Sequence, residues 1–154
     1  MKNIKKILVT FFGLGLLPYA PGTFGTLGAV AIYLALAYFN VNAIVLFILW
    51  VLTTALCIIL APWAKEHFHS DDPKQFVLDE VAGFFFTMMF ISFRRFWLAA
   101  ALGFILFRFF DILKPFPIKR AECLPQNIAV VADDIVAGLY ANIFLRVTLS
   151  LMPG

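Results

Sequence analysis

The stretch of residues 42–62 constrains the fold most, because it is almost entirely apolar and carries no charged side chain. A helix needs about 20 apolar residues to cross the hydrocarbon core of a bilayer, and this stretch has that length. The chain of 154 residues is 63% hydrophobic and 14% charged, whereas soluble domains average about 45–50% and about 25%. The sequence therefore predicts a small multi-pass membrane protein and excludes a soluble, disordered or disulfide-stabilised domain.

Four further apolar segments have about the length of membrane spans: residues 24–39, 77–93, 96–113 and 130–152. With residues 42–62 they predict an all-α bundle of about five spanning helices, forming a single domain over residues 1–154. The apolar run of residues 7–17 is too short to cross a bilayer, so we expect an interfacial or re-entrant segment there. Prolines follow this run without a small-residue cleavage site, which argues against a signal peptide.

Lysine and arginine residues predict which end of the bundle faces the cytoplasm. With the N-terminus inside, the cytoplasmic side carries Lys2, Lys5, Lys6, Lys65, Lys74, Lys114, Lys119 and Arg120. The outer side carries Arg94 and Arg95, so the positive-inside rule favours this orientation. It also accounts for the net charge of +3 without a nucleic-acid partner. Arg146 falls inside the last predicted span, where the sequence suggests nothing beyond a packing or lipid contact.

The acidic residues all fall on this cytoplasmic side, in loops or at the ends of predicted spans. They are Glu66, Asp71, Asp72, Asp79, Glu80, Asp111, Glu122, Asp133 and Asp134. A carboxylate within a membrane helix costs about 2.5–3.5 kcal/mol on insertion scales. A chain this apolar that gathers its acids in one layer is therefore predicted to build a functional site there.

Two acid pairs open two predicted spans, and small residues follow each pair. They read Asp79-Glu80-Val81-Ala82-Gly83 and Asp133-Asp134-Ile135-Val136-Ala137-Gly138. In each motif one acid precedes the glycine by four positions, so both lie on the same helix face. Glycines let membrane helices approach closely, and two such helices would bring four carboxylates together at one depth. Helix N-capping is the alternative, but it explains two pairs of acids poorly.

Arg108, Asp111 and Lys114 follow one another at intervals of three and share one broad stripe of a helix. Pro115 and Pro117 then end this helix. The alternative is an ordinary ion pair at the membrane boundary, with Lys114 reaching toward the headgroups. The two acid pairs in the same layer favour a functional role.

Residues 18–28 form a glycine- and threonine-rich turn that opens a helix, and they include Gly22, Thr23, Gly25 and Thr26. Backbone N–H groups and hydroxyls at such a turn can bind an anion such as phosphate. No Gly-Lys-Ser/Thr follows, so the turn is not a P-loop. A re-entrant turn with a threonine cap explains the pattern equally well, and the sequence leaves both interpretations open.

Acidic and basic side chains in one layer indicate phosphoryl chemistry with a hard divalent cation. Repulsion among carboxylates favours binding of such a cation, and all-oxygen ligands favour magnesium or manganese over zinc. His67 and His69 lie in the same layer, but their spacing is more typical of solvated loop histidines than of metal ligands. The sequence lacks the motifs of covalent cysteine, histidine and aspartyl-phosphate enzymes, which favours attack by a metal-activated water. A covalent aspartyl-phosphate is the less favoured alternative.

Four motifs in series carry a family resemblance. They are Pro21-Gly22-Thr23-Phe24-Gly25-Thr26, Leu78-Asp79-Glu80-Val81-Ala82-Gly83, residues 107–117 and residues 133–138. In order and spacing they resemble the phosphatidylglycerophosphatase A family over nearly the whole chain. The resemblance implies a magnesium-dependent enzyme of the bacterial cytoplasmic membrane. Such an enzyme hydrolyses phosphatidylglycerophosphate to phosphatidylglycerol and phosphate, with its active site facing the cytoplasm.

The resemblance also assigns roles to residues. The carboxylates expected to bind Mg²⁺ or act in catalysis are Asp79, Glu80, Asp111, Asp133 and Asp134. The residues expected to bind the substrate are Arg108, Lys114, Gly22, Thr23, Gly25 and Thr26. Asp72 matches an acid that commonly precedes the Asp-Glu pair, but its surroundings match loosely and its role stays open. The expected partners are the lipid substrate and membrane lipids.

Two alternatives remain at this point. One is a phosphatase for another lipid phosphate, such as phosphatidic acid or a prenyl phosphate. The other is a small membrane cation transporter, because acids and helix-packing glycines within membrane spans also fit a transporter. Transporter acids lie near the bilayer midplane, whereas these acids lie at helix ends, which favours the enzyme.

Overall fold

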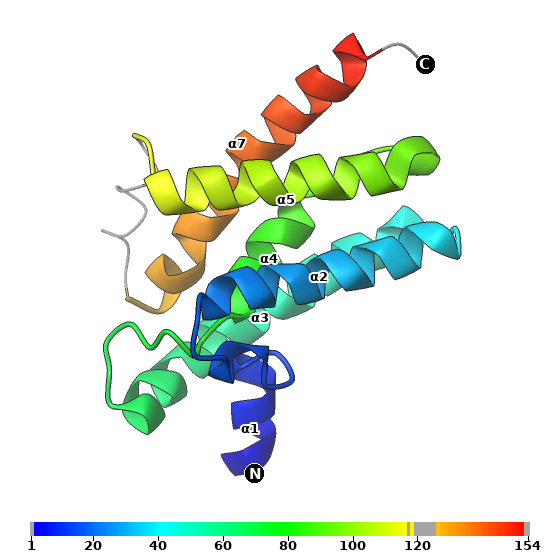
Figure 1. Ribbon diagram of the computed structural model, residues 1–154. Helices are drawn as coiled ribbons and strands as arrows, with labels where there is room; N and C mark the ends of the chain where they lie inside the picture. The colour runs from blue at the N-terminus through cyan, green and yellow to red at the C-terminus, as the bar shows by residue number, and fades with distance from the viewer. Residues whose placement is uncertain (1, 117, 119–125, 153–154) are drawn as a thin grey trace.

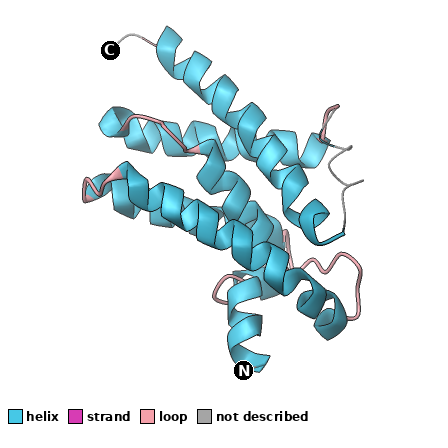
Figure 2. Cartoon of the chain, turned by 180° about the vertical axis from the view of Figure 1, so that it is seen from behind, coloured by secondary structure: helices cyan, strands magenta, loops and turns pink. Residues whose placement is uncertain are grey.

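In the computed structural model, every regular element of the described residues is a helix (Figure 1), and loops connect the helices (Figure 2). The structure describes residues 2–116, 118 and 126–152. Pro117, Lys119, Arg120 and Glu122, which entered the sequence predictions, lie outside the described residues. The predicted all-α bundle is confirmed for the described part of the chain.

Four helices of the described chain are long and apolar enough to cross a membrane: Pro21–Tyr38, Ala43–Phe68, Phe96–Leu113 and Ile128–Leu151. The elements are, in order, α1 (Lys2–Val9), η1 (Leu14–Leu16), α2 (Pro21–Tyr38), α3 (Ala43–Phe68), α4 (Leu78–Thr87), η2 (Phe93–Arg95), α5 (Phe96–Leu113) and α7 (Gln126–Leu151). The long helices correspond to four of the five predicted spans, and their contacts with one another and with α4 form the bundle.

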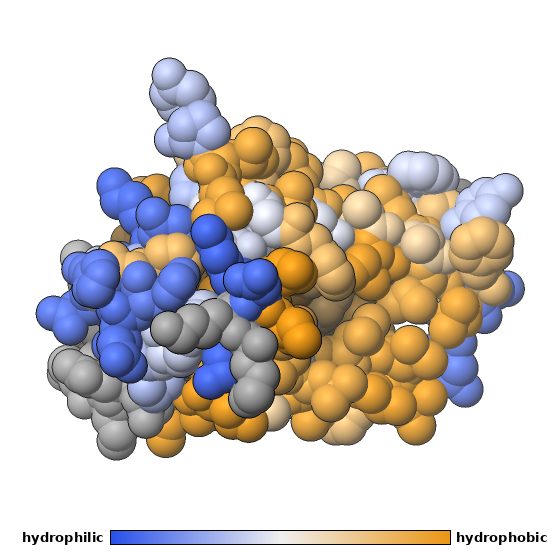
Figure 3. Space-filling view, turned by 90° about the horizontal axis from the view of Figure 1, so that it is seen from below, coloured by the Kyte–Doolittle hydropathy of each residue, from blue (hydrophilic) through white to orange (hydrophobic). Residues whose placement is uncertain are grey.

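The outer faces of the long helices are apolar, as contact with lipid requires. Large side chains such as Ile59 on α3 and Ile143 and Val147 on α7 are exposed. Figure 3 shows apolar residues over most of one face, with hydrophilic residues gathered at one end and a smaller group at the other. This distribution is typical of a protein that lies in a bilayer with its two ends in water.

The N-terminal segment does not span the bundle. The helix α1 has eight residues and projects from the other helices (Figure 1). A turn with Gly13 in the left-handed region, at a φ of 92°, leads from α1 into η1. The Val77 amide donates a hydrogen bond of 3.0 Å to the Val9 carbonyl, which ties this segment to the residue before α4. The prediction of a short, non-spanning segment is confirmed.

The predicted span over residues 77–93 is not one long helix. The helix α4 has ten residues and is too short to cross a bilayer, and the backbone turns after it, with Phe90 at a φ of 60°. Residues 88–92 then continue to η2 and the start of α5 at the far end of the bundle (Figure 1). The physical reason is that α4 lies inside the bundle: Val81, Ala82 and Phe84 are fully buried. In the described part of the chain, four long helices and a short inner helix therefore stand where about five spans were expected.

Side chains of α7 supply hydrogen bonds to the backbone where α4 ends. The Asn142 Nδ2 group donates to the carbonyls of Thr87 at 2.7 Å and Met89 at 2.8 Å. One turn along, Arg146 Nη2 donates to the Phe90 carbonyl at 3.3 Å, and its guanidinium lies 5.8 Å from the centre of the Phe90 ring. Non-helical backbone at membrane depth needs such partners, because lipid offers none. These contacts account for Arg146, which the sequence left without a role.

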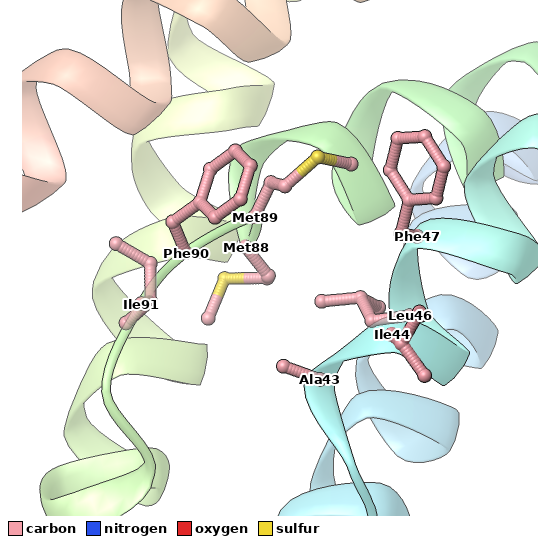
Figure 4. A pocket seen from close by; sticks show the side chains of 8 residues that line it. All are labelled: Ala43, Ile44, Leu46, Phe47, Met88, Met89, Phe90 and Ile91. Carbon is pink, nitrogen blue, oxygen red and sulfur yellow. The ribbon is translucent and has the colours of Figure 1, made fainter.

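An apolar cavity of about 360 Å³ lies beside the end of α4. Figure 4 shows the residues that line it: Ala43, Ile44, Leu46 and Phe47 from the start of α3, and Met88, Met89, Phe90 and Ile91 from the segment after α4. Since all eight side chains are apolar, the cavity can take hydrocarbon but offers no side-chain group for polar chemistry. The polar side chains lie instead at the end of α3 and the start of α4, the opposite ends of these helices.

Replacing Asn142 with leucine should destabilise the protein by about 1–3 kcal/mol, because the Thr87 and Met89 carbonyls would lose their side-chain donor. Thr148→Val is the matched control on the same helix, since among the described residues the Thr148 hydroxyl bonds to the Phe144 carbonyl of its own helix and not to α4. Thermal unfolding in detergent measures both variants. Equal stability of Asn142→Leu and Thr148→Val would show that the end of α4 does not depend on Asn142.

Candidate active site

The five predicted carboxylates come from three helices and line one cavity of about 420 Å³. Asp79 and Glu80 lie in the first turn of α4, Asp111 in the last turn of α5, and Asp133 and Asp134 near the start of α7. The full lining is Lys65, Asp71, Asp72, Asp79, Glu80, Asp111, Lys114, Ala129, Val130, Asp133 and Asp134. The structure thus brings the acids to one end of the bundle, as the two acid-glycine motifs predicted.

Two glycines allow α4 and α7 to approach closely enough to form this cavity. A methyl group on Gly83 would lie 2.7 Å from the Asp134 carbonyl oxygen, and one on Gly138 would lie 2.5 Å from the Gly83 carbonyl oxygen. Such distances are too short for any side chain, and the obstructing atoms are backbone, which cannot turn away. The predicted close packing at these glycines is confirmed, and it places the acid pairs of both helices side by side.

Two ion pairs cross the cavity wall. Arg108 Nη1 lies 2.6 Å from Asp111 Oδ2, within α5, so the ion pair that the sequence offered as the alternative to a functional role is present. Lys114 Nζ lies 2.6 Å from Asp133 Oδ2 on α7, so it also reaches across to another helix. Lys114 can do so because α5 ends at Leu113 and Lys114 itself adopts a left-handed conformation with a φ of 41°. Of the two basic residues expected to bind phosphate, Lys114 lines the cavity, whereas Arg108 does not line it and is paired with Asp111, which does.

Several buried polar atoms of the site have no hydrogen-bond partner among the described residues. They are Glu80 Oε2, Asp133 Oδ1, Asp134 Oδ1 and Arg108 Nε. Asp134 is 5% exposed, so water does not readily compensate its charge. Unpaired buried carboxylate oxygens are costly, and a cation or a donor from a ligand would relieve that cost. The cavity is thus electrostatically incomplete by itself.

The carboxylate oxygens are of the kind that Mg²⁺ prefers. In the part of the chain that the structure describes, however, no three His, Cys, Asp or Glu side chains already stand in an arrangement that could hold a metal ion. The five carboxylates fit a hard cation, because they offer oxygen ligands and several of these oxygens are unpaired. Binding of the cation would require the carboxylates to move closer to one another.

The glycine-threonine motif forms the first turns of α2, which begins at Pro21. Gly22 faces the site, because a methyl group there would overlap Glu80 Oε1 and lie 3.4 Å from Arg108 Nη1. Thr23 is half-buried in the same turn. Gly25 packs against Val77, and the buried Thr26 hydroxyl donates to the Gly22 carbonyl at 2.9 Å. Gly25 and Thr26 thus have packing contacts and do not line the cavity, and phosphate binding by these four residues stays a prediction.

Other residues around the site were not singled out by the sequence or were singled out only weakly. Lys65, in the last turn of α3, and Asp71 line the cavity, as does Asp72. The sequence feature that could have indicated these three residues is their position at and just beyond the end of a predicted span. His67 stacks on Trp63, with 4.5 Å between ring centres, and does not line the cavity. Both histidines are exposed, as expected, but His67 lies in the last turn of α3 and not in a loop.

Comparison with known proteins adds the family to this geometry. The family model described as phosphatidylglycerophosphatase A matches residues 7–149. The chain belongs to this family. It is 38% identical to phosphatidylglycerophosphatase A of Haemophilus influenzae over 144 residues, covering 89% of this chain and 83% of the relative. It is 30% identical to phosphatidylglycerophosphatase A of Escherichia coli over 140 residues, covering 90% and 80%.

A third relative of the chain has a name that is not phosphatidylglycerophosphatase A. It is a Bacteroides thetaiotaomicron protein named "Putative phosphatidylinositol-3-phosphatase", 36% identical over 150 residues, with 92% of this chain and 91% of the relative covered. No solved structure gives a significant match. The family and the apolar helices identify the chain as a bacterial membrane phosphatase that acts on a phosphomonoester.

Gly138→Ala should lower phosphatase activity at least about tenfold and destabilise the protein by about 1–3 kcal/mol, because its methyl group would push α7 away from α4. Gly103→Ala is the matched control, since the nearest atom to its methyl group is the flexible Met88 Sδ at 2.6 Å. Phosphate release and thermal unfolding in detergent measure both. Wild-type values for Gly138→Ala would mean that close packing of these helices is not required.

Proposed function

We propose that the protein hydrolyses phosphatidylglycerophosphate to phosphatidylglycerol and phosphate, with Mg²⁺, at the cytoplasmic face of the membrane. One observation carries the proposal: five carboxylates from three helices, with Lys114 directly after α5, line a single cavity at one end of an apolar bundle. A lipid headgroup lies at that depth while its acyl chains stay in the leaflet, so the substrate can reach the cavity laterally. The names of the H. influenzae and E. coli relatives support this choice of substrate.

Arg108 and Lys114 would bind the terminal phosphate. Both are already paired with carboxylates that line the cavity, Asp111 and Asp133, so little side-chain freedom remains to be lost on binding. Arg108 keeps a buried Nε without a partner among the described residues, which makes it a donor for a phosphate oxygen. Gly22 lies beside Arg108 and Glu80 and leaves room for the Glu80 carboxylate, since a methyl group there would overlap Glu80 Oε1.

The carboxylates of Asp79, Glu80, Asp111, Asp133 and Asp134 would hold Mg²⁺. Support comes from the unpaired buried oxygens of Glu80, Asp133 and Asp134 and from the preference of Mg²⁺ for oxygen ligands. When bound, Mg²⁺ neutralises charge on the phosphoryl group and promotes attack by water.

The chain's own residues would carry out the remaining steps. Arg108 and Lys114 orient the phosphoryl group so that water attacks phosphorus opposite the ester oxygen. One carboxylate of the cavity takes a proton from that water, and the P–O bond to the glycerol breaks. The glycerol oxygen then takes up a proton, and phosphatidylglycerol and inorganic phosphate leave. The choice of base lies among the same five carboxylates.

Basic residues support placing the cavity on the cytoplasmic side. Lys65 and Lys114 line the cavity, and α1, with Lys5 and Lys6, packs against α3. Lys74 lies in the connection that leads to α4. Arg94 and Arg95 lie in η2, at the end where α5 begins and hence opposite Asp111. By the positive-inside rule, this distribution of basic residues supports a cavity in the cytoplasmic leaflet.

Phosphatidylinositol 3-phosphate is the second candidate substrate, because the Bacteroides relative is named for it. It shares with phosphatidylglycerophosphate a phosphomonoester on a polyol headgroup that is joined to the lipid by a phosphodiester. A cation transporter is less well supported, since the acids line a cavity at helix ends and include two salt-bridged pairs.

Asp79→Asn and Asp134→Asn should each lower phosphate release at least about 100-fold, because each removes a negative charge that would hold Mg²⁺ or accept a proton. Both variants should still insert and purify, since asparagine keeps the shape of aspartate. Glu66→Gln is the matched control, because Glu66 is an exposed acid outside the cavity. Near-normal turnover by either aspartate variant would contradict the role of that carboxylate.

Purified protein in neutral detergent should release phosphate from phosphatidylglycerophosphate with Mg²⁺ present, lose this activity after treatment with EDTA, and regain it when Mg²⁺ is returned. Phosphatidylinositol 3-phosphate and phosphatidic acid are assayed in parallel to rank the substrates. Full activity after EDTA treatment would refute the need for a divalent cation. No release from any of these lipids by well-folded protein would refute the proposed function.

A further inference from the structure

Lys65 lies on a wall of the cavity that the predicted site residues do not form. It is in the last turn of α3, whereas the five carboxylates come from α4, α5 and α7. Its backbone is fixed, because the Lys65 carbonyl accepts hydrogen bonds from the amides of His69 and, at 3.2 Å, Ser70. Its side chain is half-buried and lines the cavity together with Asp71 and Asp72. The fold thus adds the positive charge of Lys65 to the cavity, from α3 and not from the helices that carry the five carboxylates.

Lys65 differs from the other two basic residues because it forms no salt bridge among the described residues, although Asp71 and Asp72 line the same wall. Arg108 and Lys114 each lie 2.6 Å from a carboxylate oxygen. Among the described residues, no carboxylate lies within salt-bridge distance of Lys65. A cation without a carboxylate partner attracts an incoming anion more strongly than one that is already paired.

The substrate proposed above has two phosphate groups, and only one reacts. The terminal phosphomonoester is hydrolysed, whereas the phosphodiester that joins glycerol to the diacylglycerol stays intact. A three-carbon glycerol separates them, so a cavity that binds the first group must also accommodate the second. The acids, Arg108 and Lys114 take up the phosphomonoester in the proposed reaction, which leaves the phosphodiester without a partner.

We propose that Lys65 binds the non-reacting phosphodiester of the substrate and thereby selects headgroups that carry both a phosphodiester and a phosphomonoester. This inference rests on the proposed function and adds the recognition of the second phosphate. The Lys65 contact would distinguish phosphatidylglycerophosphate from phosphatidic acid, which has a phosphomonoester but no phosphodiester. Lys65 acts here in binding and does not touch the reacting atoms, so its loss should affect KM and leave kcat nearly unchanged.

The test compares Lys65→Gln with the wild-type protein in neutral detergent, where the added lipid supplies the phosphodiester groups. We expect KM for phosphatidylglycerophosphate to rise about ten- to hundredfold, as for the loss of one charge-assisted hydrogen bond, with kcat within about twofold. The inhibition constant of short-chain phosphatidylglycerol, which carries the phosphodiester alone, should rise by a similar factor. The inhibition constant of inorganic phosphate should stay unchanged, because it binds where the phosphomonoester binds.

Two further variants separate charge recognition from a folding defect. Lys65→Arg should keep most of the affinity for phosphatidylglycerol, because it keeps the charge. Lys74→Gln is the matched control, since Lys74 is an exposed lysine of the α3–α4 connection that does not line the cavity. It should behave as the wild type, and thermal unfolding should be similar for all three variants.

Three results would overturn the inference while leaving the proposed function standing. They are an unchanged KM in Lys65→Gln, inhibition by phosphatidylglycerol that Lys65→Gln does not weaken, and an equal rise in the inhibition constant of inorganic phosphate. The last result would place Lys65 at the phosphomonoester. If instead the wild-type protein releases no phosphate from phosphatidylglycerophosphate or phosphatidylinositol 3-phosphate, the proposed function fails, and this inference falls with it.

Discussion

The contact between α4 and α7 is the interaction on which the rest of the structure depends. It runs along one stripe of α7, in which Asp134, Gly138, Asn142 and Arg146 follow one another at intervals of four. The Asp134 carbonyl and Gly138 pack against Gly83, whereas Asn142 and Arg146 donate to backbone carbonyls beyond it on the α4 side. One helix face therefore carries a carboxylate of the site, the glycine that permits close approach, and two donors that end the inner helix. Asn142 and Arg146 cost little on this stripe, because backbone carbonyls at the end of α4 accept their hydrogen bonds, whereas Asp134 keeps an unpaired buried oxygen.

This contact also explains how so many charges share one cavity in an apolar protein. Two of the carboxylates are paired with Arg108 and Lys114, and the remaining buried oxygens face a common space. A bundle built this way keeps its acids concentrated where a phosphate and a hard cation would meet. The same arrangement leaves Lys65 apart from the ion pairs, so the cavity has chemically distinct walls.

The sequence predicted the architecture and the convergence of the acids well, because both follow from strong local signals. Long apolar runs define the helices, and an acid placed four residues before a glycine puts both on one face. The sequence failed for residues 77–93, since hydropathy cannot separate a helix that faces lipid from one that is buried among other helices. It also could not assign Asn142 or Arg146, whose partners are backbone carbonyls more than fifty positions away. The glycine-threonine motif was ambiguous in sequence, and its residues divide between the edge of the site at Gly22 and packing at Gly25 and Thr26.

The short inner helix has a consequence for biogenesis. The ribosome makes α4 well before α7, yet α7 supplies the donors for the end of α4 and the surface against which Gly83 packs. Until α7 is synthesised, the nascent chain holds a ten-residue helix with two acids at its start and unsatisfied carbonyls at its end. Such a segment gains little from partitioning into lipid by itself. It follows that the active site assembles as a late, post-insertion event, completed when the C-terminal helix docks.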